Sequence, residues 1–428
     1  MEEKTLLEPV KTPFGRLLAG LLIGEGGQFL ALMTPLLLIL VFKIMEINPE
    51  NYTVSFGVIT GLGAFFAIFA NPLGGAISDR TGLKFGRRRT WILLGSVLGS
   101  ASLAGVALST KVWMVAVFWC CVCVFFNFGL AAATALVPDQ VDESKRGTLS
   151  GIAGLVVPFS AVIGMLIMTM LGKTPLVQKY GVLAAIGIIT AIISVTLIKE
   201  GKVEYKPKEK EKEREKLSFG ETLSKIYPSP RKYPIFTWGW LTRFFITMAY
   251  CSSNYNTIMF MQRYHLSQEE TSKMATILGA VTMLFLAVSS VLGGVLSDKF
   301  RKQKPFVAAS AIVVGIGVVI NIFAPSVSYV VISSIISSFG YGIFLAVDVA
   351  LIARILPKEK DAAKDFGIMN VANTIPQSIV PFIAPTLLAI GGWGFLFGSL
   401  SIFAALSALA VIPIPEMSPK PVKESVEV

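Results

Sequence analysis

The feature that most constrains this chain is a series of twelve apolar segments, each long enough to cross a bilayer as a helix. A transmembrane helix needs about 20 predominantly apolar residues. Charged residues make up 15% of the sequence, against about 25% in soluble domains. The sequence therefore predicts an all-α membrane protein with twelve transmembrane helices. The predicted spans are 17–42, 54–78, 90–109, 112–137, 148–171, 181–198, 235–261, 272–297, 305–324, 328–353, 366–390 and 392–414.

The distribution of positive charge predicts the orientation of the chain. An even number of spans places both termini on one side, and the segments on that side hold 31 of the 38 Lys and Arg residues, against 6 on the other side. By the positive-inside rule, both termini are cytoplasmic. The net charge of +11 is thus explained by topology, and we expect no nucleic-acid partner. Residues 1–16 lack the apolar core of a secretory signal, so we expect the first span to stay in the plasma (inner) membrane.

The sequence also repeats itself. GGAISDR at 74–80 recurs as GGVLSDK at 293–299, 219 residues later, and the same shift relates Pro138 to Pro357 and Asp142 to Asp361. One register that matches two loops indicates duplicated halves, as in many secondary transporters. We predict an N-terminal six-helix half at 1–198, a cytoplasmic linker at 199–233, a C-terminal six-helix half at 234–414 and a tail at 415–428. The linker is too charged to bury an apolar face.

The loop after the second span carries a family resemblance. The run GGxxSDRTGxxxGRRR at 74–89 resembles the loop 2–3 signature of the major facilitator superfamily. Segment 78–95, SDRTGLKFGRRRTWILLG, resembles the glycoside–pentoside–hexuronide cation symporters and the sucrose–proton symporters. Segment 24–40 resembles the first span of the sucrose–proton symporters, and segments 135–152 and 356–377 resemble loops 4–5 and 10–11 of bacterial members. The resemblance implies two pseudo-symmetric six-helix halves that work by alternating access on a sugar or glycoside. The glycoside symporters place acidic residues where this chain has Ala67 and Asn71, so we expect a proton rather than sodium as the coupling ion.

The same loop is predicted to act as a conformational latch. It is too short to bind a nucleotide by itself, and the strand that a phosphate-binding loop requires is not expected before it. Its glycines allow close helix approach, Asp79 can pair with arginines or cap a helix N-terminus, and the arginines can meet lipid phosphates. The alternative is that its charges serve only as a topology signal. The predicted latch residues are Gly74, Gly75, Asp79, Arg80, Gly86, Arg87, Arg88 and Asp298.

Three ionisable residues inside spans are predicted to take part in proton coupling: Glu25, Arg243 and Asp348. Such residues are costly in a bilayer and usually face a cavity and a partner. Glu25 and Arg243 each lie about 12 Å into their span, so they can pair directly. An apolar setting favours the neutral carboxyl, and we expect Glu25 to carry the proton with Arg243 as its counter-charge; a fixed ion pair is the alternative. Asp348 is expected to face the basic segment 299–304 or to bind a cation.

A polar stripe on the seventh span predicts a ligand-binding face. Arg243, Thr247, Tyr250, Asn254 and Thr257 follow one another at spacings of 4, 3, 4 and 3, which keeps them on one side of a helix. Amides, hydroxyls and an aromatic ring suit a hydroxyl-rich ligand, although helix–helix hydrogen bonds use the same residue types. The predicted substrate-binding residues are Gln28, Tyr250, Asn254, Thr257, Asn370, Asn373 and Gln377.

The remaining chemistry argues against an enzyme. The four cysteines lie inside spans and the only histidine, His265, lies in an outer loop, so we expect no metal site, cofactor or catalytic centre. The predicted function is secondary active transport, most simply proton-coupled symport of a sugar or glycoside by a monomer in contact with membrane lipid. Two alternatives are a proton-coupled exporter of amphipathic compounds, favoured by the many phenylalanines, and a membrane sensor or scaffold without transport activity.

Overall fold

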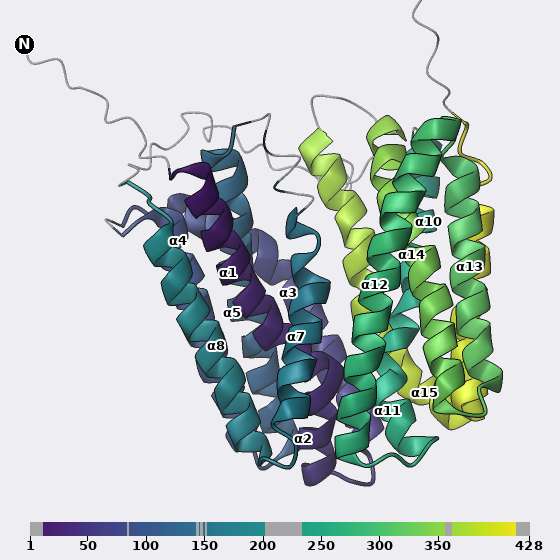
Figure 1. Ribbon diagram of the computed structural model, residues 1–428, viewed down its shortest axis with the longest axis horizontal. Coiled ribbons are helices and arrows are strands. Elements are labelled where there is room, and N and C mark those ends of the chain that lie inside the picture. Colours follow the sequence, from purple (N-terminus) through teal and green to yellow (C-terminus); the bar gives the residue numbers. More distant parts are fainter. Residues whose placement is uncertain are drawn as a thin grey trace, which may run out of the picture. The chain divides into compact units, whose positions relative to one another are not determined.

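The computed structural model describes residues 12–83, 85–142, 145, 149, 152–201, 233–355 and 362–416, and its regular elements there are all helices (Figure 1). Most of the predicted linker and tail, with Pro357 and Asp361 of the repeat, lie outside these residues. In chain order the elements are α1 (Phe14–Thr34), η1 (Pro35–Ile39), α2 (Leu40–Ile47), α3 (Tyr52–Arg80), α4 (Arg87–Leu108), α5 (Val112–Gln140), α7 (Val156–Met170), α8 (Leu176–Leu197), α10 (Pro234–Tyr250), η3 (Cys251–Tyr255), α11 (Asn256–Gln262), α12 (Gln268–Phe300), α13 (Lys304–Phe323), α14 (Val327–Ile355) and α15 (Ala362–Ala410).

The all-α, multi-span fold predicted from the sequence is confirmed. Nine helical segments of the described chain are long and apolar enough to cross a membrane, fewer than the twelve predicted. The difference has three causes. Helix α7 has only 15 residues, span 235–261 is divided into α10, η3 and α11, and spans 366–390 and 392–414 share α15, which leaves helical geometry at Gly391 and Gly392.

The chain forms two compact units. Unit 1 contains the described parts of Met1–Arg214, together with Asn254–Ala280 and Ser378–Thr386. Unit 2 contains those of Glu215–Ser253, Val281–Gln377 and Leu387–Val428. These units do not follow the predicted halves residue by residue, because α11 and the first part of α12 belong to unit 1. The boundaries of the halves, which come from the repeat, stay a prediction.

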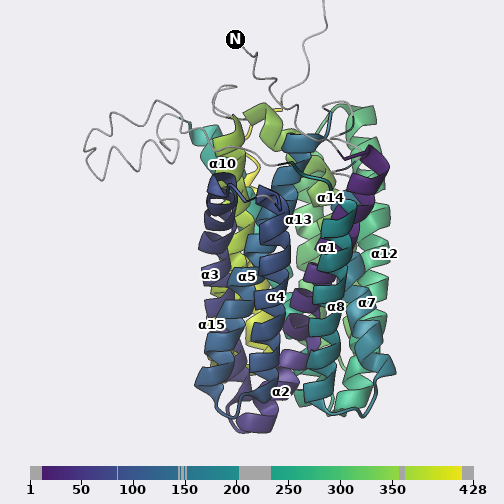
Figure 2. The same cartoon turned by 90° about the vertical axis from the view of Figure 1, so that its left-hand side faces the viewer.

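Unit 1 is built from helices that pack closely through small residues. Helix α4 packs on α5 and α8, α3 packs on α5, and α1 packs on α7 and α8 (Figure 2). A Cβ atom on Gly24 of α1 would lie 2.5 Å from Ser194 Oγ of α8, and one on Gly95 of α4 would lie 2.6 Å from the backbone oxygen of Phe125. Van der Waals packing between small residues is a main source of helix association in a bilayer, so these glycines hold unit 1 together.

Unit 2 uses the same device. Helix α13 packs on α14, and α10 packs on both (Figure 1). A Cβ atom on Gly340 of α14 would lie 2.8 Å from the backbone oxygen of Ser310, and one on Gly293 of α12 would lie 2.9 Å from Ile343 Cα. Gly293 is the repeat counterpart of Gly74, where a Cβ would lie 2.7 Å from Phe128 Cα of α5. The duplicated motif therefore makes the same kind of close helix contact in each unit.

Two predicted spans are not continuous α-helices. The first contains the π-helical turn η1, which begins at Pro35, and the seventh contains the 3-10 segment η3 between α10 and α11. Proline lacks a backbone donor and disturbs the hydrogen-bond ladder, which explains the irregularity at η1; η3 contains no proline. The chain passes from unit 2 to unit 1 within η3, so this break divides the polar stripe predicted on span 235–261.

Candidate functional site

The N-terminus of α4 is held by a carboxylate from the segment that follows α8. Glu200 accepts hydrogen bonds from the backbone N–H of Arg88, at 2.9 Å and 3.2 Å to its two oxygens, and from that of Arg89 at 3.1 Å. The first N–H groups of a helix have no partner inside the helix, and they carry the positive end of its dipole. Glu200 therefore supplies the cap that the N-cap residue, Gly86, lacks.

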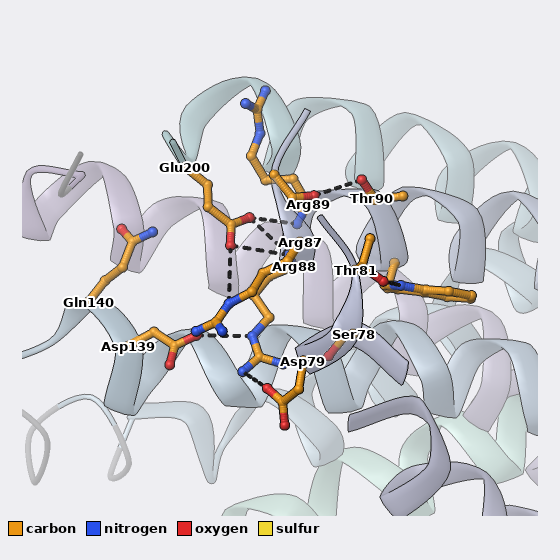
Figure 3. A network of polar contacts seen from close by, with 12 residues as sticks. Ser78, Asp79, Thr81, Arg87, Arg88, Arg89, Thr90, Asp139, Gln140 and Glu200 are labelled. Carbon is orange, nitrogen blue, oxygen red and sulfur yellow. Dashed lines mark hydrogen bonds and ion pairs between the residues drawn. The ribbon is translucent and has the colours of Figure 1, made fainter. Parts of the chain in front are cut away.

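The arginines of this loop are bound by two further carboxylates (Figure 3). Arg88 Nη2 lies 2.5 Å from Asp79 Oδ1, and its Nε lies 3.0 Å from Asp139 Oδ2. Asp139 also accepts Arg87 Nη2 at 2.8 Å. We call Asp79, Arg87, Arg88, Asp139 and Glu200 the arginine network; it joins α3, α4, α5 and the end of α8 within unit 1.

Burial sets the protonation behaviour of Glu200. Its side chain is 7% exposed, and this burial raises the pKa of the Glu200 carboxyl above its usual value. The backbone N–H groups of Arg89 and Arg88 and the positive charges of Arg87 and Arg88 oppose that rise. Removal of the carboxylate from water costs more than these partners return, because desolvation penalises the charged form.

The predicted latch residues fall into two groups. The structure brings Asp79, Arg87 and Arg88 into one network, with Gly86 at the turn that presents them and Gly74 at the contact of α3 with α5. The other three are not brought together: Gly75 has open space beside it, and Arg80 and Asp298 are exposed. Whether the network acts as a latch stays a prediction.

Unit 2 contains a counterpart of the helix cap. The backbone N–H of Gln303, the residue before α13, donates to Glu416 Oε1 at 2.9 Å. Glu416 follows the last helix of its half, as Glu200 follows α8, and α13 follows the repeated loop as α4 does. A carboxylate after the last span thus caps the helix after the repeated loop in both units.

A second polar cluster lies in unit 2 and is centred on a buried ion pair. Arg243 Nη2 on α10 lies 2.7 Å from Asp348 Oδ2 on α14, and the two side chains are 7% and 2% exposed. The expectation that Asp348 faces segment 299–304 is therefore wrong. Its partner is Arg243, because a buried carboxylate needs a cation within reach and α10 packs directly on α14.

The next residues along α10 extend this cluster. Thr247 Oγ1 lies 3.2 Å from Asn373 Oδ1 on α15. The ring of Tyr250 stacks on that of Tyr341 with centroids 3.9 Å apart and planes at 7°, and its hydroxyl lies 3.5 Å from Ser338 Oγ. We call Arg243, Thr247, Tyr250, Ser338, Tyr341, Asp348 and Asn373 the unit 2 polar cluster.

The rest of the predicted ligand-binding face does not join this cluster. Asn254 lies within η3 and Thr257 lies on α11, and both belong to unit 1. Thr257 Oγ1 donates to the backbone oxygen of Leu37 in η1 at 2.5 Å, which is a helix–helix contact. On α15, Asn370 and Gln377 are exposed, and the contact of Gln377 with the cluster is a hydrogen bond within its own helix, from its amide to the backbone oxygen of Asn373 at 3.2 Å.

On α1, the two predicted residues have different surroundings. Gln28 is fully buried, and its amide donates to Ser96 Oγ at 2.7 Å and to the backbone oxygen of Ile92 at 3.3 Å. That geometry matches the helix–helix alternative for a polar residue in a span. Glu25 is half-buried and forms no ion pair within the described part of the chain. The direct pairing of Glu25 with Arg243 stays a prediction.

Four residues of these sites were not predicted. Asp139 and Glu200 complete the arginine network, and Ser338 and Tyr341 belong to the unit 2 polar cluster. The sequence contains a signal for the role of Asp139. This residue lies in the last turn of its helix, where the helix dipole disfavours an acid unless a cation is near. In the described residues no group of three or more metal-ligating side chains comes together.

With this geometry established, comparison with known proteins identifies the family. The profile of the Major Facilitator Superfamily matches residues 26–286 and 271–427. The chain belongs to the major facilitator superfamily. It is therefore a multi-pass membrane protein from a family of transporters, which confirms the family indicated by the loop at 74–89.

Individual relatives of this superfamily member are distant. A general alpha-glucoside permease of Schizosaccharomyces pombe is 26% identical over 265 residues, which are 54% of this chain and 46% of the permease. The chain thus matches about half the length of that curated relative. Among solved structures, a D-xylose–proton symporter is 16% identical with a TM-score of 0.69, covering 94% of this chain and 97% of that one. A bacterial homologue of human Spinster, occupied and inward-facing, is 14% identical with a TM-score of 0.70, covering 95% and 99%.

Proposed function

We propose that this transporter is a proton-coupled symporter that carries a sugar or glycoside by alternating access. The observation that carries the proposal is the match to a general alpha-glucoside permease over about half of each chain. The unit 2 polar cluster supports it, because Thr247, Asn373 and the Tyr250–Tyr341 stack offer donors, acceptors and flat aromatic faces within one unit. A hydroxyl-rich ring is recognised by that combination of groups.

Glu25 is the proposed carrier of the coupling proton. Within the described residues it has no cationic partner, so no fixed cation holds it in the charged state. Ionisable groups in spans mark proton pathways in many transporters. Ala67 and Asn71 stand where the related glycoside symporters have acids, and this favours a proton over sodium.

The arginine network is the proposed latch of the alternating-access cycle. Its other four charged side chains tie the ends of α3, α4 and α5 to Glu200. Such a set of ion pairs favours one conformation over another only if the pairs differ between the two. We also propose that the loop and both termini are cytoplasmic and that the protein lies in the plasma membrane; the excess of positive charge on this side supports the orientation. We further propose that the protein works as a monomer.

The test begins with a thermal-shift panel on purified protein that contains mono- and disaccharides, α-glucosides and lipophilic cations. Uptake of the compounds that raise the melting temperature is then measured in proteoliposomes, with and without a proton gradient that is acidic outside. We expect an α-glucoside such as maltose to stabilise the protein and to accumulate only with the gradient. Stabilisation by lipophilic cations alone would favour the exporter, and binding without flux would favour a sensor.

The role of Glu25 has a separate test. Glu25→Gln should retain exchange of the transported sugar across the membrane but lose uphill accumulation, because a neutral amide cannot bind and release the proton. Glu50→Gln, an exposed residue in the turn before α3, is the matched control and should behave as the wild type. Unchanged uphill uptake in Glu25→Gln would rule out Glu25 as the carrier.

A further inference from the structure

Two aromatic side chains of α10 form a flat stack next to the unit 2 polar cluster. The rings of Trp240 and Phe244 have centroids 5.2 Å apart and planes at 12°. The indole N–H of Trp240 donates to the backbone oxygen of Ile368 on α15 at 3.1 Å. This hydrogen bond fixes the orientation of the indole, and the stack holds the phenyl ring nearly parallel to it. We call Trp240 and Phe244 the aromatic pair.

The aromatic pair differs in burial from the aromatic core of the same unit. Phe236, Phe344 and Phe397 are at most 1% exposed, whereas both members of the pair are only half-buried. The pair does not share the most exposed face of α10 either. That face carries Trp238, which is 38% exposed, and a step of two residues turns a helix by about 200°. The pair therefore belongs neither to the core nor to the outer face of the helix.

The pair continues the helix face that carries the unit 2 polar cluster. Thr247 follows Phe244 by three residues and Trp240 by seven, and these intervals keep side chains on one side of a helix. Further along α10, Tyr250 stacks on Tyr341. The face thus carries an aromatic stack at each end, with the hydroxyl of Thr247 between them.

The distance between the two stacks constrains the size of a ligand that contacts both. Phe244 and Tyr250 are six residues apart, which is about 9 Å along the helix axis. A single sugar ring is shorter than this distance and contacts one stack at a time, whereas two linked rings span it. The groups between the stacks, Thr247 and its neighbour Asn373 on α15, offer hydrogen bonds to the hydroxyls of such a ligand.

We propose that the aromatic pair binds the second ring of a two-ring α-glucoside, while the glucosyl ring lies at the unit 2 polar cluster. The substrate class is then α-glucosides whose aglycone is a ring, either a second sugar or an aryl group, rather than free glucose. This inference rests on the proposed function, because it names the substrate class of the same site. An aryl ring and the C–H face of a sugar both bury apolar surface against a flat aromatic side chain.

The chemistry of the pair predicts what it distinguishes. Its only polar side-chain atom, Nε1 of Trp240, already donates to Ile368. The pair therefore adds affinity through contact area and not through hydrogen bonds, so it selects for the presence of a ring and not for the configuration of its hydroxyl groups. An aryl glucoside should bind more tightly than a glucoside whose aglycone is a methyl group.

Isothermal titration calorimetry on the purified full-length protein tests this preference, with methyl α-glucoside and p-nitrophenyl α-glucoside as probes. The wild type should bind the nitrophenyl compound about 2- to 10-fold more tightly. Trp240→Ala should reduce the ratio of the two affinities to about one. Trp238→Ala, on the exposed face of the same helix, is the matched control and should keep the wild-type ratio. An equal ratio in Trp240→Ala and the wild type would overturn the proposal.

Tryptophan fluorescence supplies a second readout that does not depend on the stability of Trp240→Ala. A nitrophenyl group quenches the emission of a tryptophan that it contacts. The quenching by p-nitrophenyl α-glucoside that excess maltose reverses should be lost in Trp240→Phe and kept in Trp238→Phe. Quenching that persists in Trp240→Phe would contradict the assignment. If Trp240→Ala does not purify, Phe244→Leu carries the calorimetric test, because leucine fills space without a flat ring.

The same measurements separate the failure of this inference from that of the proposed function. Glucosides that bind with an unchanged nitrophenyl preference in Trp240→Ala would refute the role of the aromatic pair and leave the proposed function standing. The absence of binding by every glucoside to the wild type would refute the proposed function, and the assignment of the pair with it.

Discussion

The carboxylate of Glu200 lies directly against the bare α-carbon of Gly86. A Cβ atom at position 86 would be 2.5 Å from Glu200 Oε2 and 3.0 Å from Glu200 Cβ. Gly86 also has φ of +109°, a backbone conformation that side-chain-bearing residues rarely adopt. The glycine therefore serves two purposes: it makes the turn into α4, and it lets Glu200 reach the first N–H groups of that helix.

Substitution of Gly86 by alanine should destabilise unit 1. We expect a loss of about 1–3 kcal/mol for the strained backbone, with displacement of Glu200 in addition. Thermal unfolding of the purified protein measures the change. Gly82→Ala is the matched control in the same loop, because a Cβ there meets nothing within 4 Å. Equal melting temperatures for the two variants would show that the turn does not require glycine.

The raised pKa of Glu200 predicts an unusual dependence of stability on pH. Because burial raises this pKa, the folded protein binds the proton more tightly than the unfolded chain. The stability from Glu200 is fully present below the unfolded value, about 4.3, and is lost as the pH rises through the raised value. The wild-type melting temperature should therefore fall relative to that of Glu200→Gln as the pH rises from the unfolded value through the raised one, and the difference should stay constant at higher pH. Glu50→Gln should keep the wild-type pH dependence.

The two aspartates of the arginine network should differ in importance. Asp139 is 26% exposed and accepts both Arg87 and Arg88, whereas Asp79 is 56% exposed and accepts Arg88 alone. Asp139→Asn leaves two cations short of a partner, and we expect a cost of about 1–3 kcal/mol. Asp79→Asn should cost about 0–1 kcal/mol, as exposed pairs usually do. Chemical or thermal unfolding of the two variants compares them, and the reverse order would contradict this account of the network.

The fold was predictable because its signal is spread over the whole chain. Hydropathy located the helices of the described chain, and the structure contains a close helix contact both at Gly74, where the sequence predicted one, and at its repeat counterpart Gly293. Breaks inside spans were not predicted, since a 3-10 segment such as η3 has no distinct sequence signature. For that reason the regular spacing from Arg243 to Thr257 predicts one helical face, although the chain changes helix type after Tyr250.

Only some residues of the arginine network and of the unit 2 polar cluster could be predicted, and the reason is the same for the two sites. Sequence identifies which residues are costly in a membrane, as it did for Arg243 and Asp348, but it does not identify partners that are far apart in the chain. Asp348 meets Arg243 rather than the nearby basic segment, and Glu200 reaches α4 across more than 100 residues. Pairings of this kind depend on which helices pack together.

Gln28 should prove to be a structural residue rather than a ligand contact. Its amide donates to Ser96 Oγ at 2.7 Å in the interior of unit 1. In a double-mutant cycle, Gln28→Leu and Ser96→Ala should show a coupling energy of about 0.5–1.5 kcal/mol in thermal unfolding. The thermal shift produced by a bound sugar should be the same in Gln28→Leu as in the wild type. A lost ligand shift without coupling to Ser96 would instead assign Gln28 to the binding site.

Gly239 and Ile355 form a contact that can be tested by adding a methyl group at position 239 and removing one at position 355. A Cβ on Gly239 of α10 would overlap only Ile355 Cδ1 on α14, with its other neighbours at 3.5 Å or more. Gly239→Ala alone should be destabilised by this overlap, by about 1–3 kcal/mol, and Ile355→Val alone should lose about 0.5–1.5 kcal/mol. The double variant should exceed both in melting temperature, because valine lacks the overlapping methyl group and alanine favours the helix by about 1 kcal/mol over glycine. Gly15→Ala, where a Cβ meets nothing within 4 Å, isolates the helix preference. Simple additivity of the two changes would show that α10 and α14 do not pack as described.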